Sequence, residues 1–149
     1  MDANHLYFFL PLVIVCTFGG WLSYIDFKIH RLPNAIVATM TLLIAMCLGF
    51  AQEPTKHLYF AIGFFVIFLL LFFASRQQLG MGDVKFAVPL GLATSFYSLR
   101  LDLLIFNTFM AAGVVTSVLL ISRRISLQSQ IAFGPIMTVG AIFTIITAI

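Results

Sequence analysis

Long apolar runs separated by short polar breaks cover almost the whole chain. Five runs reach roughly the 20 residues that a membrane-crossing helix needs. They are residues 6–25, 35–51, 58–74, 103–121 and 131–149. A sixth run begins near Val84 and stays apolar only to about Phe96 or Leu99. The pattern predicts six helices joined by loops that are too short to hold another domain.

The composition explains why these runs are not the core of a water-soluble domain. Hydrophobic residues make up 62% of the 149 positions and charged residues 9%, with a mean hydropathy of +1.11. A soluble domain is about 25% charged, and a chain this short cannot hide so much apolar surface from water. Disordered, nucleic-acid-binding and disulfide-stapled secreted proteins are excluded on the same grounds. We therefore predict an all-α polytopic membrane protein, with residues 1–149 forming a single bundle of about six transmembrane helices.

The distribution of lysine and arginine predicts the orientation in the membrane. The first, third and fifth loops carry Lys28, Arg31, Arg76, Lys85, Arg123 and Arg124. The other side carries only Lys56 and Arg100. Because basic residues concentrate on the cytoplasmic side, we expect these three loops in the cytoplasm and both termini outside. The first residues contain no basic n-region, so we do not expect the first helix to be a cleaved signal peptide.

The cysteines and histidines do not indicate a metal site. Cys16 and Cys47 both fall inside predicted helices, without a CxxC pair. His5, His30 and His57 are scattered over loops, and none has a second histidine at i+3 or i+4. We expect no metal and no cofactor.

Two aspartates mark the same predicted membrane edge. Asp26 ends the first helix, which runs inward, and Asp83 opens the fourth helix, which runs outward. Both would reach the cytoplasmic edge, where a carboxylate beside hydrocarbon is costly and is a functional candidate by default. The other acidic residues, Asp2, Glu53 and Asp102, lie in loops or at the terminus.

The segment before the fourth helix is rich in glycine. From Val84 to Phe96 the helix would span about 20 Å, short of a bilayer core of about 30 Å. We expect the segment Leu79-Gly80-Met81-Gly82-Asp83, with Gly80, Met81 and Gly82 as the active-site loop, to dip into the membrane and supply the missing length. Glycines without side chains would let an extended substrate chain approach this backbone closely.

Two carboxylates in one site can hydrolyse a peptide bond without a cofactor. Since both cannot ionise easily, one holds a proton near neutral pH. The ionised carboxylate takes a proton from water while the protonated one donates to the carbonyl oxygen. Which aspartate has which role stays open. The alternative is that Asp26 and Asp83 only pair with Lys28, Arg31 or Lys85 at the headgroups.

The residues around both aspartates resemble the type IV prepilin peptidase family. Asp26 begins a segment that runs through basic residues to Leu32-Pro33-Asn34, and Asp83 ends a Gly-x-Gly-Asp (GxGD) motif. That family of bacterial membrane aspartyl proteases carries an Asp followed by (Ile/Leu)-Pro-Asn and a GxGD loop. The resemblance covers nearly the whole chain and implies Asp26 and Asp83 as the catalytic pair.

Several neighbouring residues fit a supporting structural role. Pro33 is expected to stop helix formation in the first loop and Asn34 to cap the second helix. Lys85, two residues beyond Asp83, is expected to point away from it as a headgroup anchor. Phe133-Gly134-Pro135 also looks like a family feature. Gly19 with Ser23, and Gly91, are expected to allow close helix packing.

The resemblance also implies a substrate. It predicts a prepilin or pseudopilin precursor with a short basic leader, cleaved where a hydrophobic helix begins. Without a four-cysteine zinc domain, the chain looks like the short, peptidase-only form of tight-adherence (Flp) pilus systems, which cleaves without methylation. The implied location is the bacterial inner membrane, with anionic lipid and pilus assembly machinery as further partners and no nucleic acid.

Three other interpretations remain. Presenilin-like proteases share the GxGD motif, but they pair it with a Tyr-Asp inside a helix, and here Ile25 separates Tyr24 from Asp26. A small transporter subunit would use both aspartates as ion sites, yet the chain shows no internal repeat. A non-enzymatic assembly factor would retain the helices without needing both aspartates and both glycines.

Overall fold

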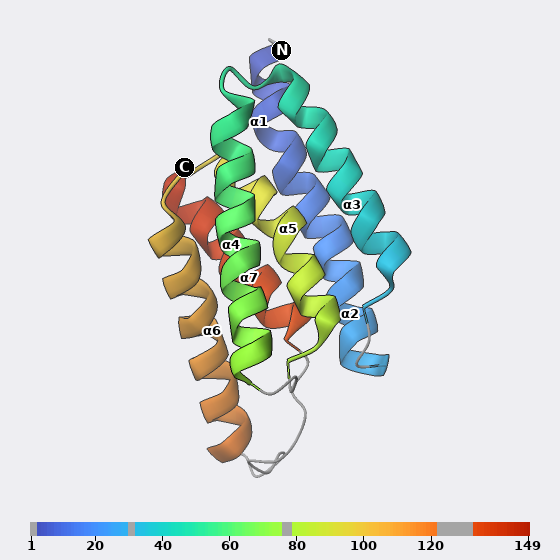
Figure 1. Cartoon of the computed structure of the whole chain (residues 1–149), viewed down its shortest axis with the longest axis vertical. Helices are drawn as coiled ribbons and strands as arrows, with labels where there is room; N and C mark the ends of the chain where they lie inside the picture. The colour runs from blue at the N-terminus through green and yellow to red at the C-terminus, as the bar shows by residue number, and fades with distance from the viewer. Residues whose placement is uncertain (1–2, 30–31, 76–78, 122–132) are drawn as a thin grey trace.

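The computed structural model describes residues 3–29, 32–75, 79–121 and 133–149, and nearly all of them are helical (Figure 1). The elements in chain order are α1 (Ala3–Ile14), η1 (Val15–Gly19), α2 (Gly20–Ile29), α3 (Asn34–Cys47), η2 (Leu48–Phe50), α4 (Pro54–Ala74), α5 (Met81–Ser95), α6 (Leu101–Ile121) and α7 (Gly134–Ala148). These ranges contain no strand. The predicted all-α class is confirmed.

The first helical rod is longer than the sequence pattern predicted. Helical structure continues from α1 through the π-helical turn η1 into α2, and it ends at Ile29 rather than near residue 25. Asp26 therefore lies in the last turn of α2, and the helix continues for three residues beyond it. The reason is local, because no proline or glycine follows Asp26 before Pro33.

The glycine-rich segment is helical, which corrects our expectation of an irregular loop. α5 begins at Met81, so Met81, Gly82 and Asp83 form its first turn. Gly80 precedes it in an extended conformation, with φ −69° and ψ 137°. The Gly80 carbonyl accepts hydrogen bonds from the N–H groups of Asp83 (3.0 Å) and Val84 (3.4 Å). A helical turn satisfies backbone groups that a loop at membrane depth would leave without partners.

The short helix α5 lies at the centre of the bundle. It packs against α3, α4 and α7, and most of its side chains are buried. α3 and α4 meet at one end of the bundle and diverge toward the other, with α5 between them (Figure 1). Fifteen residues give a length of about 22 Å. Protein surrounds nearly all of α5, so its length need not match the bilayer as that of a lipid-facing helix must.

The outer helices carry the apolar surface expected of a membrane protein. Within the described residues, three helical stretches are long and apolar enough to cross a bilayer: Phe9–Ile29, Pro54–Ala74 and Leu101–Val118. Asn34–Phe50 and Gly134–Ala148 are shorter apolar helices. Large hydrophobic side chains on these helices, such as Leu70 and Phe73, are exposed. Water would not tolerate such a surface, and the chain is a membrane protein.

Small residues bring two helix pairs into close contact. A Cβ atom at Gly91 of α5 would lie 3.2 Å from the Cα of Ala61 in α4, as expected from the sequence. A Cβ at Gly140 of α7 would lie 2.6 Å from the Cα of Thr108 in α6. Next to that contact, the Asn107 amide donates a hydrogen bond to Thr144 Oγ1 (2.9 Å). α6 and α7 therefore approach nearly backbone to backbone.

Much of the charge pattern that predicted the orientation falls outside the described residues. These include Arg31, Arg76, Arg123 and Arg124, together with His30. Lys28 and Lys85 are described, and both are exposed. The predicted start of the sixth helix at residue 131 also lies outside, and α7 begins at Gly134.

We predict that Gly140→Ala destabilises the bundle by about 1–3 kcal/mol, because the added methyl group would collide with the Thr108 backbone. Gly113→Ala on α6 is the control, since a Cβ there meets nothing within 4 Å. That substitution should be neutral or raise stability by up to about 1 kcal/mol through helix preference. Thermal unfolding in detergent micelles measures both variants. Equal stability of the two would contradict the close α6–α7 approach.

Candidate active site

The structure brings Asp26 and Asp83 to the same cavity, although they come from different helices. Asp26 lies in the last turn of α2 and Asp83 in the first turn of α5. Their side chains are buried, with exposed fractions of 5% and 8%. Both line a cavity of about 310 Å³ together with the predicted active-site segment Gly80, Met81 and Gly82, and with Leu32, Asn34 and Lys85. The cavity therefore gathers nearly every site residue that the sequence predicted.

Gly80 makes room for the Asp83 carboxylate. A Cβ at position 80 would lie 3.1 Å from Asp83 Oδ2. With no side chain at Gly80, the carboxylate can fold back over the first turn of α5. The amino end of a helix favours a negative charge there.

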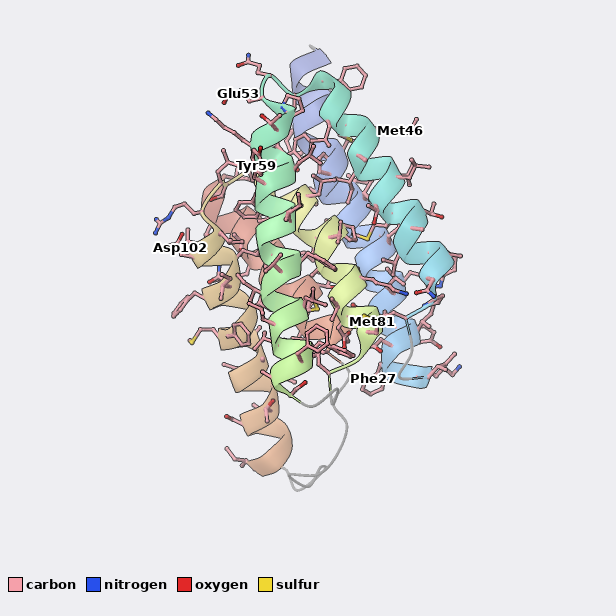
Figure 2. The ribbon with its side chains drawn as sticks, in the orientation of Figure 1. Phe27, Met46, Glu53, Tyr59, Met81 and Asp102 are labelled. Carbon is pink, nitrogen blue, oxygen red and sulfur yellow. The ribbon has the colours of Figure 1, made fainter. Side chains whose placement is uncertain are left out.

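Gly82 packs against the segment that follows α2. A Cβ at this position would lie 3.0 Å from the Cβ of Leu32. Gly82 thus packs closely on Leu32 and Gly80 on Asp83, and both glycines also line the cavity. The approach of an extended substrate chain to this backbone stays a prediction. Met81 and Gly80 are the exposed members of the segment. Figure 2 places Met81 and Phe27 at the same end of the bundle, opposite Glu53.

Asp26 is held by the amino end of α7, a contact that the sequence did not predict. The Gly134 N–H donates a hydrogen bond to Asp26 Oδ2 (3.0 Å). A Cβ at position 134 would lie 2.9 Å from the same oxygen, so only glycine allows this approach. The first N–H groups of a helix lack partners within it, and a carboxylate is a favourable acceptor. One feature could have indicated this contact. The helix starts at Gly134-Pro135 without a capping side chain, so its first N–H groups need an acceptor from elsewhere.

A second polar contact holds α7 against α2, one turn from Asp26. Ser23 Oγ donates a hydrogen bond to Thr138 Oγ1 (3.1 Å), and Thr138 donates to the Gly134 carbonyl (3.0 Å). A Cβ at Gly19 would lie 2.8 Å from Thr138 Cγ2. The expected close packing by Gly19 and Ser23 is confirmed, and it fixes the end of α7 that contacts Asp26.

Lys85 and Asn34 have roles that differ from those expected. Lys85 Nζ donates a hydrogen bond to Asn34 Oδ1 (3.1 Å), and both residues line the cavity. Lys85 is therefore not only a headgroup anchor that points away from the aspartates. Asn34 is the first residue of α3 and not its cap, because Pro33 occupies the cap position. The Pro33 carbonyl accepts from the N–H groups of Ile36 (3.1 Å) and Val37 (3.2 Å).

Two buried carboxylates dominate the electrostatics of the cavity. The sequence offered Lys28 as an ion-pair partner of the aspartates. Lys28 Nζ donates a hydrogen bond to the Tyr24 hydroxyl (3.5 Å) and lies over the Tyr24 ring. Like charges in one low-dielectric cavity disfavour double ionisation, which favours a pair that shares one proton. One carboxylate can then accept a proton while the other donates one.

Among the described residues, no group of three His, Cys, Asp or Glu side chains is arranged to hold a metal ion.

Comparisons with known proteins gave one match. The model of the type IV leader peptidase family matches residues 13–121, a range that contains both aspartates. No curated protein and no solved structure matches the chain significantly.

We predict that Asp83→Asn raises the free energy of unfolding by about 1 kcal/mol or more, because it removes one of two buried like charges. Thermal unfolding in micelles at about pH 8, where an ordinary carboxyl is ionised, measures the effect. Asp102→Asn is the control, since Asp102 is exposed and pairs with Arg100. That change should stay within about 0.5 kcal/mol. A less stable Asp83→Asn protein would instead mean that nearby cations stabilise the carboxylate.

Proposed function

The chain belongs to the type IV leader peptidase family, and we propose that it is an aspartyl endopeptidase with Asp26 and Asp83 as its catalytic pair. The family makes the chain a peptidase that acts on prepilin-type precursors. The observation that supports the catalytic pair is the single cavity that both buried carboxylates line.

The proposed reaction needs only water and the two carboxyl groups. The ionised carboxylate removes a proton from water as the water oxygen attacks the scissile carbonyl carbon. The protonated carboxyl donates its proton to the carbonyl oxygen, giving a neutral tetrahedral intermediate. When the intermediate collapses, the C–N bond breaks and the leaving nitrogen receives a proton from the carboxyl that first took one from water. At the same time the other carboxylate takes a proton back from a hydroxyl group of the intermediate, and the C=O bond of the new carboxyl end forms again. The two carboxyl groups thereby return to a state with one proton between them.

We propose Flp-like prepilins as the substrates, cleaved between a short basic leader and the hydrophobic helix. Cleavage at this junction requires an active site at the cytoplasmic surface of the inner membrane. The exposed Lys28 and Lys85 lie on the two helices that carry the aspartates, near the cavity. Glu53 lies at the opposite end of the bundle (Figure 2). Lys56 and Arg100 are exposed as well, so the orientation rests on the sequence, whose first, third and fifth loops carry six Lys and Arg residues against two on the other side. This bias supports a cytoplasmic cavity in a multi-pass protein with both termini outside. Anionic lipid is the proposed partner of the basic leader.

The non-enzymatic interpretations lose support at the same site. An ion-transporting subunit would need its carboxylates along a path through the bilayer, whereas Asp26 and Asp83 lie at one end of α2 and α5. An assembly factor would not require two buried carboxylates in a common cavity, which cost free energy.

We predict that Asp26→Asn and Asp83→Asn each lower the rate of precursor cleavage by at least about 10²-fold, because each removes a group that transfers protons. Asp102→Asn is the matched control and should cleave at the wild-type rate. The assay follows release of the leader from a precursor inserted in lipid vesicles. Cleavage that survives either substitution would refute the paired mechanism. A folded wild-type protein that cleaves no precursor would refute the proposed function.

We also predict that Gly134→Ala lowers kcat by about 10-fold or more, because its methyl group would displace the Asp26 carboxylate. The same assay measures the loss, with Gly113→Ala as the control for an added methyl group on an exposed helix position. Wild-type kcat in the Gly134→Ala protein would show that Asp26 does not need this contact.

A further inference from the structure

The central helix α5 has one open face, and that face begins at the cavity. All residues of α5 are buried except Met81, Gly82, Lys85 and Val88. Spacings of three and four residues place these positions on one side of the helix. Met81, Gly82 and Lys85 line the cavity, and Val88 lies one turn farther along.

A groove of about 650 Å³ lies over this open face, between α3 and α4. Asn34 and Lys85 line both this groove and the cavity that holds the aspartates, so the two spaces adjoin at these residues. The groove corresponds to the region where α3 and α4 diverge on either side of α5 (Figure 1).

The chemistry of the groove changes along its length. Its polar groups, Asn34 and Lys85, lie where it meets the cavity. Beyond them the lining is mostly aliphatic and aromatic. α3 contributes the small residues Ala38, Thr41 and Ala45, and Thr41 donates its hydroxyl proton to the Val37 carbonyl (2.8 Å). Small side chains with no unsatisfied polar group let the backbone of another apolar helix approach closely.

We propose that this groove binds the hydrophobic helix of the substrate, starting directly after the scissile bond. The proposal rests on the proposed function, because it requires a precursor whose apolar helix follows the cleaved bond. From Asn34 to Ala45 the groove follows α3 for about 17 Å, the length of about 11 helical residues of substrate. The bond to be cleaved then lies at the aspartates while the helix continues along α3 and α5.

Photo-crosslinking tests the position and direction of the bound helix. Benzoylphenylalanine replaces Ala38 or Ala45 in the Asp83→Asn background, which keeps the precursor uncleaved. Thr39 and Met46 are the matched controls, because each is adjacent, exposed and outside the groove. We expect the probe at Ala38 to crosslink precursor residues nearer the scissile bond than the probe at Ala45, with weak crosslinks from the controls. The reverse order, equal crosslinking by the controls, or adducts only with lipid or a second copy would overturn the proposal.

Kinetics provide the second test and separate this proposal from the proposed function. Thr41→Trp fills the groove and should raise KM for the precursor by about 10-fold while kcat stays within about twofold, as expected when only binding is lost. Thr39→Trp should change neither constant. If the wild-type protein cleaves the precursor and Thr41→Trp leaves KM unchanged or lowers only kcat, the groove does not bind the helix. If the wild-type protein cleaves no precursor, the proposed function itself fails.

Discussion

The hydrogen bond from the Gly134 N–H to the Asp26 carboxylate is the interaction on which the site depends. A carboxylate in the last turn of a helix faces the negative end of that helix, which disfavours its charge. The amino end of α7 compensates with a free N–H group and a dipole of the opposite sign. Asp83 occupies the favourable end of its own helix, α5. The two aspartates thus reach one cavity from opposite kinds of helix end, and α7, a distant segment of the chain, holds Asp26 there.

That hydrogen bond constrains the packing of α7 against α2. The 3.0 Å contact requires glycine at position 134, and it also requires α7 to keep its place relative to α2. The Ser23–Thr138 hydrogen bond and the contact of Gly19 with Thr138 hold the two helices one turn away. On its other side α7 packs closely on α6 through Gly140 and Thr108. Small residues and hydroxyl groups therefore position the Asp26 carboxylate, where large apolar side chains would only separate the helices.

The sequence was sufficient to predict what depends on local pattern. Apolar runs of membrane length predicted the helices, and the scarcity of acidic residues singled out Asp26 and Asp83. The start of α5 at Met81 was not predicted, because glycines suggest a loop unless the neighbouring backbone groups are known. The roles of Gly134, Lys85 and Asn34 were also missed, since each depends on a partner in another helix. Helix periodicity predicts which residues share a face of one helix. It does not predict which face of another helix packs against them.

The placement of α5 joins the proposed catalytic cavity to the proposed helix-binding groove. The first turn of α5 carries Asp83, and Lys85 and Val88 on its open face line the groove. Because one helix carries both features, the distance between Asp83 and the α5 side of the proposed helix-binding groove is fixed. A peptide bond would then be selected by its position at the start of an apolar helix, with little need for a pocket for each neighbouring side chain. A cavity of about 310 Å³ can hold the backbone around one peptide bond, whereas the longer groove supplies the apolar area on which binding would depend.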